Sequence, residues 1–127
     1  SLDTSAGSTD DYFAQMRLSR QSSRDSAVEL LEETIAYDEG TTVGDTASQT
    51  LNRIVGAALS EAQIESLIIA KGFTDCVTYM ADETVSVAVS APAEGLSTAD
   101  VALISDVVTS QTDYDLSQVR VIEVKAQ

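Results

Sequence analysis

The stretch that decides the fold is residues 71–91, KGFTDCVTYMADETVSVAVSA, where the spacing of the hydrophobic residues changes. Before Lys71 apolar residues recur every three or four positions, as on one face of a helix, and after Phe73 they follow a period of two, as in strands. Gly72 can adopt the left-handed conformation that ends a helix. The acidic pair at residues 82–83 supplies a tight turn. The stretch therefore predicts a helix end followed by a β-hairpin whose second strand buries a row of valines.

On the C-terminal side, the pattern predicts one more helix and one more strand. Ser97 is placed to cap the helix, with Asp100 at the third helical position completing a capping box. Residues 119–124, VRVIEV, form the last strand. Together with the helix before Lys71, the order is αββαβ, an α+β fold with two helices packed on one face of a three-stranded sheet. Such a sheet has two open edges, and each can accept a strand of another chain.

The N-terminal side predicts three parts: a flexible tail over residues 1–9, a long helix over 10–40, and the α+β domain over 41–127. The long helix is expected to start near a cap at Ser8. Residues 19–26 within it contain no apolar side chain. Because that stretch has nothing to bury, we expect the helix to project from the domain as a stalk with only its ends engaged.

Short sequence signals also place the boundaries of the second helix. It is expected to begin after Gly44, with Asp45 or Thr46 as its cap. No residue near Leu59 forbids a continuous helix, so one uninterrupted helix is expected up to Lys71.

Three of the chain's seven basic residues, Arg17, Arg20 and Arg24, fall on one face of the long helix. Their spacing of three and four residues has two interpretations. The first is a solvated face of the helix. The second is a docking stripe for an acidic surface of a partner. The sequence leaves both open.

Composition argues against several classes of function. The chain carries 21 acidic and seven basic residues, a net charge of −14, which repels nucleic acid and anionic lipid. It has no histidine and a single cysteine, Cys76, which we interpret as a small buried residue of a strand. The acidic clusters at residues 82–83 and 113–115 are interpreted as solvated turns. We therefore expect no catalytic residue, no metal site and no cofactor.

Residues 65–89, ESLIIAKGFTDCVTYMADETVSVAV, resemble the core signature of the stage III sporulation protein AH family. Residues 11–33, DYFAQMRLSRQSSRDSAVELLEE, and the VRVIEV strand agree with that family in order and spacing. The resemblance implies a ring-building motif. It also implies a single-pass cell-membrane protein whose anchor precedes residue 1 and whose domain faces the space between mother cell and forespore. The partner implied is a forespore membrane protein similar to stage II sporulation protein Q, with which family members form a channel, and self-assembly into a ring is a further expectation.

The residues predicted to bind a partner lie on the arginine face and in the last strand: Arg17, Arg20, Arg24, Val119, Arg120, Val121 and Glu123. Two alternatives to a non-enzymatic assembly domain stay open. One is a small ferredoxin-like ligand-binding or regulatory module, because such sheets serve many functions. The other is a ring component of a different secretion apparatus.

Overall fold

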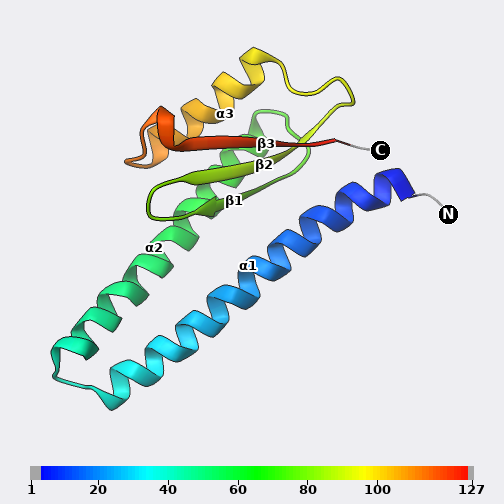
Figure 1. Ribbon diagram of the computed structural model, residues 1–127. Coiled ribbons are helices and arrows are strands. Elements are labelled where there is room, and N and C mark those ends of the chain that lie inside the picture. Colours follow the sequence, from blue (N-terminus) through cyan, green and yellow to red (C-terminus); the bar gives the residue numbers. More distant parts are fainter. Residues whose placement is uncertain (1–3, 126–127) are drawn as a thin grey trace.

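A computed structural model describes residues 4–125 of the chain, with side chains from Thr9 onward. The elements follow one another as α1 (Thr4–Tyr37), α2 (Thr42–Ala70), β1 (Cys76–Met80), β2 (Val85–Ala91), α3 (Thr98–Gln111), the 3₁₀ turn η1 (Leu116–Gln118) and β3 (Val119–Lys125). Figure 1 shows α1 and α2 as a long antiparallel helical hairpin whose connecting end extends well beyond the sheet. The α+β order that the sequence predicts is confirmed.

The sheet is mixed, in the order β1-β2-β3. Strands β1 and β2 pair antiparallel, with Thr78 opposite Val87. Strands β2 and β3 pair parallel, with Val87 opposite Val121, and α3 makes the crossover that a parallel pair needs. This places β1 and β3 at the two edges.

The larger core lies between the sheet and the helices α2 and α3. The predicted valine row of β2 is fully buried there. It packs against side chains of both helices, among them Ile64, Ile68, Ile104 and Val108. The prediction of two helices on one face of a three-stranded sheet is therefore confirmed.

The opposite face of the sheet is covered in part by α1. Phe13 is fully buried and packs against Val77 of β1 and Ala88 of β2. The hydroxyl of Tyr79 donates a hydrogen bond to the carbonyl of Met16, 2.9 Å away. The N-terminal half of α1 is therefore a third layer of the fold.

This packing shows that the expectation of a projecting stalk is wrong. The stretch 19–26 buries no apolar side chain, yet its two arginines reach the carboxylates of α2 and hold the helix in place. Polar anchoring replaces the missing hydrophobic contact. The part that extends beyond the sheet is the far half of the α1–α2 hairpin (Figure 1).

The predicted boundaries hold at several helix ends. Ser97 and Asp100 form the expected capping box, and Gly72, with φ of 109°, ends α2 as expected. Helix α2 is continuous. Two predicted starts are wrong.

Helix α1 begins at Thr4, so the tail predicted over residues 1–9 does not extend into residues 4–9; Ser1–Asp3 lie outside the described residues. No proline interrupts this segment, so the helix continues upstream of the expected cap at Ser8. Helix α2 begins at Thr42 and not after Gly44, because Thr41 caps it by accepting a hydrogen bond from the amide of Gly44, 3.1 Å away. A Cβ at Gly44 would lie 2.4 Å from the carbonyl oxygen of Asp38, so this tight connection needs glycine.

Candidate functional site: a sealed strand edge and an open one

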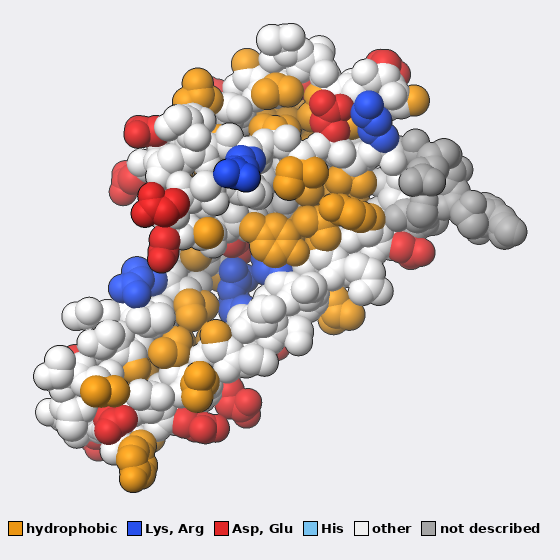
Figure 2. Space-filling model, viewed as in Figure 1, with side chains coloured by type: hydrophobic (Ala, Val, Ile, Leu, Met, Phe, Trp, Pro, Cys, Tyr) orange, Lys and Arg blue, Asp and Glu red, His pale blue; other side chains and the backbone are white. Residues whose placement is uncertain are grey.

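The three arginines predicted to dock a partner bind the chain's own carboxylates. Arg20 donates to Glu65 at 2.7 Å, and Arg24 donates to Glu61 at 2.8 Å. Arg17, the most exposed of the three, pairs with Asp75. Figure 2 shows basic side chains in the gap between α1 and the rest of the molecule. Neither interpretation of the sequence pattern, solvated face or docking stripe, included this internal role.

Glu61 is the centre of this cluster and was missed in the sequence. Its side chain is only 2% exposed. The available signal was its position, three residues before Ile64 and seven before Ile68, which places an acid within the buried stripe of α2. An acid in such a stripe requires a buried cation, because an unpaired buried charge is strongly unfavourable.

The same side chains seal the outer edge of β1. The carbonyl of Thr78 accepts from Arg20 at 2.7 Å, and its amide donates to Glu65 at 2.7 Å. The amide of Met80 donates to Glu61 at 3.0 Å. Since these backbone groups are the ones that another strand would pair with, β1 cannot accept a strand in this conformation. The expectation of two open edges is wrong for β1.

Ion pairs and backbone hydrogen bonds join the arginine cluster to α2 and β1. Burial lowers the pKa of the Arg20 guanidinium, but the hydrogen bond to Glu65 and the charges of Glu65 and Glu61 outweigh burial, and the net pKa is raised. Each carboxylate accepts hydrogen bonds from a guanidinium and from the backbone of β1. A buried ion pair is favourable only when its hydrogen-bonding groups are satisfied in this way.

The outer edge of β3, at the far side of the sheet, is open. No described strand pairs with it. Thr78 directs its amide and carbonyl away from β2, so Val87, which lies opposite it, directs its own amide and carbonyl toward β3. In a parallel pair such a residue bonds to the two neighbours of its partner, so the amide and carbonyl of the partner, Val121, point outward. Val119 and Glu123 share that orientation by alternation.

The side chains of β3 divide between the two faces of the sheet. Val119 and Val121 pack against the core, whereas Arg120 is exposed. The carboxylate of Glu123 is occupied, since it accepts from the amide of Leu96 at 3.2 Å. Ile122 is 41% exposed on the face that α1 covers in part, where Figure 2 shows apolar side chains gathered above α1.

The predicted partner-binding residues therefore do not form one surface. The arginines lie beside β1, and Val119, Arg120, Val121 and Glu123 lie on β3, at the opposite edge.

Comparison with known proteins agrees with this architecture. A model of the SpoIIIAH-like protein family matches residues 2–121 of the sequence. The chain belongs to the SpoIIIAH-like family. The resemblance inferred from residues 65–89 is thereby confirmed. No curated protein sequence matches the chain.

Two solved structures share the fold of this SpoIIIAH-like chain. A chain of the SpoIIQ-SpoIIIAH pore forming complex superposes with a TM-score of 0.75, covering 91% of this chain and 96% of that one at 19% identity. EscJ, a type III secretion system protein of enteropathogenic E. coli, gives a TM-score of 0.53 at 22% identity, covering 61% of this chain and 52% of EscJ. The fold is therefore similar to a ring-building motif. Between Thr4 and Lys125, no helix combines the length and the apolarity that crossing a membrane requires.

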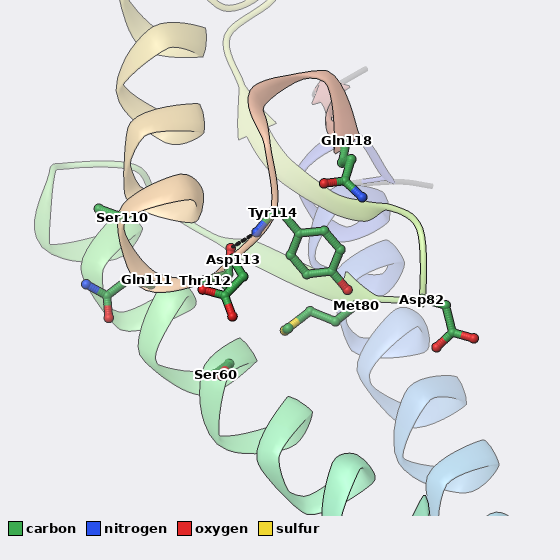
Figure 3. Close-up of a pocket in the computed structure, with 9 residues that line it drawn as sticks. All are labelled: Ser60, Met80, Asp82, Ser110, Gln111, Thr112, Asp113, Tyr114 and Gln118. Atoms are coloured by element: carbon green, nitrogen blue, oxygen red, sulfur yellow. Dashed lines mark hydrogen bonds between the residues drawn. The ribbon is translucent and has the colours of Figure 1, made fainter.

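A hollow of about 560 Å³ lies where the β1–β2 turn meets the segment after α3 (Figure 3). Asp82 and Asp113, from the two predicted acidic turns, both line it and are exposed. Tyr114 donates its hydroxyl hydrogen to the carbonyl of Ala81 and its amide to Thr112. In the part of the chain that the structure describes, no three acidic or cysteine side chains are placed to share a metal ion. The hollow therefore lies between two turns that Tyr114 holds together, and the acidic residues of these turns remain exposed.

Cys76 occupies the structural position expected from the sequence, 1% exposed in β1. Burial, followed by the charges of Glu65 and Asp75, raises the pKa of its thiol from 9.0 to about 12. The unfolded chain therefore ionises at Cys76 at a lower pH than the folded chain does. The contribution of this thiol to stability is complete below pH 9 and is lost as the pH rises toward 12.

This difference predicts an alkaline loss of stability specific to Cys76. Above pH 9 the contribution of the thiol to the free energy of unfolding should fall by roughly 1.4 kcal/mol per pH unit. Urea unfolding of the wild type and of Cys76→Ala at pH 8, 9 and 10 measures it. The variant should show the shallower decline. If the free energy of unfolding declined equally in the wild type and in Cys76→Ala, the thiol would ionise at the same pH in the folded and unfolded chain.

Proposed function

We propose that this chain is a non-enzymatic assembly domain of a channel between mother cell and forespore, and that it binds a forespore membrane protein resembling SpoIIQ. The proposal is supported by membership of the SpoIIIAH-like family and by the shared fold with a chain of the SpoIIQ-SpoIIIAH pore forming complex. The family also supports the expectations of a single membrane anchor before residue 1, a domain facing the intermembrane space, and assembly into a ring.

The observation that carries the proposed contact is the difference between the two sheet edges. Side chains of α1 and α2 occupy the outer backbone groups of β1. No described strand pairs with the outer edge of β3, where only the amide of Val119 is engaged locally, by donating to the carbonyl of Leu116. Strand addition to a free edge supplies affinity through main-chain hydrogen bonds. We therefore place the partner on Val119, Arg120, Val121 and Glu123.

The basic residues of β3 favour a particular kind of partner strand at its edge. Arg120 and Lys125 are exposed on β3 in a chain whose net charge is −14. An acidic or neutral strand is therefore the preferred partner there, because charge complementarity favours the correct encounter. Arg17, whose side chain is 43% exposed, is the member of the arginine cluster with the most surface to offer a partner.

Two variants of β3 test this contact by calorimetry with the SpoIIQ-like protein of the same genome. Val121→Pro removes an outward amide and should weaken binding about tenfold, the worth of one hydrogen bond. Arg120→Glu leaves the backbone intact and should weaken binding through charge alone. Arg53→Glu, an exposed charge reversal on α2, is the matched control and should bind like the wild type.

The outcomes separate the function from the site. A wild-type chain that does not bind the partner contradicts the proposed function. Binding that is unchanged in both β3 variants contradicts only the edge contact, provided that thermal unfolding shows both to be folded.

A further inference from the structure

The solvent-facing side of α2 between Val55 and Ala70 carries no charge. This stretch contains only two ionisable side chains, Glu61 and Glu65, and both turn inward to the arginine cluster. The exposed side is largely apolar instead, with Gln63 and Ser66 as its polar side chains. Val55 is 50% exposed, Leu59 64% and Ile69 43%. In a surface helix the charges normally face the solvent, and here that order is reversed.

Such a face is unusual in this chain. The chain as a whole is strongly acidic, with 21 acidic residues against seven basic ones. The exposed Leu30 of α1 follows the usual pattern, since it lies beside Glu29 and within two positions of Glu32. The exposed side of α1 around Leu30 thus carries charge, whereas that of α2 between Val55 and Ala70 does not.

The exposed residues of α2 also follow a regular order. Val55, Leu59, Ala62, Ser66 and Ile69 are spaced by four, three, four and three residues. This is the spacing at which a helix presents a continuous seam to another helix. The seam is about 21 Å long at 1.5 Å per residue. Its centre is small, because Ala62 and Ser66 lie there, and small residues let two helices approach closely.

We propose that this seam, defined by Val55, Leu59, Ala62, Ser66 and Ile69, binds the same seam of a second copy of the chain. Two copies of net charge −14 repel one another, so they meet best where neither presents a charge. A basic partner would be drawn instead to the acidic surfaces. A two-fold contact is self-complementary, and it brings Ala62 against Ala62 of the second copy.

The seam favours an antiparallel pair. Val55 and Ile69 lie seven residues on either side of Ala62. An antiparallel arrangement therefore places Val55 of one copy against Ile69 of the second copy. Antiparallel helices also oppose their dipoles favourably. This inference goes beyond the proposed function, which rests on β3, because the seam leaves the β3 edge free for its partner.

A contact of one helix on each side belongs to the small, weak class of interfaces. We expect a dissociation constant on the order of 100 μM. Raising the salt concentration should strengthen the dimer, because salt screens the repulsion between two acidic bodies. An association held by opposite charges would weaken under the same change.

Sedimentation equilibrium of the wild type and Leu59→Glu tests the seam. The wild type should show a monomer–dimer equilibrium, and the variant should raise the dissociation constant at least about tenfold, since it buries an unpaired charge. Leu30→Glu is the matched control, because it adds the same charge at a leucine of equal exposure, 64% in both cases. A monomeric wild type, or equal effects of the two variants, would overturn the proposal.

Cross-linking tests the centre of the contact without adding a charge. Ala62→Cys should oxidise to a disulfide-linked dimer much faster than Ser22→Cys, which places an exposed cysteine on α1. Native Cys76 is buried and does not compete. Equal rates at the two positions would place the contact elsewhere. Binding of the SpoIIQ-like protein by Leu59→Glu should stay at the wild-type level. The seam and the proposed function can therefore be contradicted separately.

Discussion

Replacing Glu61 with alanine is expected to lower the free energy of unfolding by about 3–5 kcal/mol, the usual cost of breaking a buried ion pair from one side. The change removes the partner of Arg24 and the acceptor of the Met80 amide at once. Arg20 keeps Glu65. Urea unfolding followed by circular dichroism measures the loss as a lower midpoint with an unchanged slope.

Two further variants isolate the cause. Glu33→Ala makes the same substitution at an exposed position of α1 and should change stability by less than about 0.5 kcal/mol. Glu61→Gln keeps a hydrogen-bond acceptor but loses the charge. Its decrease in the free energy of unfolding should therefore fall between those of Glu61→Ala and Glu33→Ala. If Glu61→Ala costs no more than Glu33→Ala, the arginines are hydrated in solution and β1 is not sealed by them.

Replacing Phe13 with alanine should cost about 3 kcal/mol or more, because it empties a fully enclosed site between α1 and the sheet. Phe13 is the one fully buried residue that α1 contributes among the described residues. Its loss should free the N-terminal half of α1 while the core of α2, α3 and the sheet stays intact. Urea unfolding gives the magnitude, and amide exchange gives the location.

The exchange experiment separates local from global effects. Amides of α1 near Arg17 should lose protection in Phe13→Ala, whereas those of β2 should keep most of theirs. Tyr12→Ala is the matched control. Tyr12 is 44% exposed and contacts the ring of Phe13 edge-on, so its loss should cost about 1 kcal/mol or less. Equal protection in wild type and Phe13→Ala would mean that the arginines alone hold α1.

Most of the second half of the chain was predictable because its signals are local. Alternation in Val85, Val87 and Val89 fixes which face of a strand is buried, whatever that strand pairs with. The capping box of Ser97 and the glycine after Lys71 act within one helical turn. These signals also led to the family that the comparison confirms.

The role of α1 was not predictable in the same way. The lack of apolar residues over 19–26 correctly indicated that no hydrophobic face is buried there, but it could not show that Arg20 and Arg24 meet carboxylates of another helix. Pairing of charges across 37 to 45 positions depends on the closed hairpin of α1 and α2. No local rule connects such distant residues.

The amino-acid sequence alone determined the order of elements, the buried valine row and the family. Only the tertiary structure decided which sheet edge is free, because that depends on which strand lies beside α1 and α2. Side chains brought from α1 and α2 satisfy the outer backbone groups of β1, whereas no described strand pairs with the outer edge of β3. By drawing Glu61 and Glu65 inward, the same contacts leave the outer side of α2 without charge.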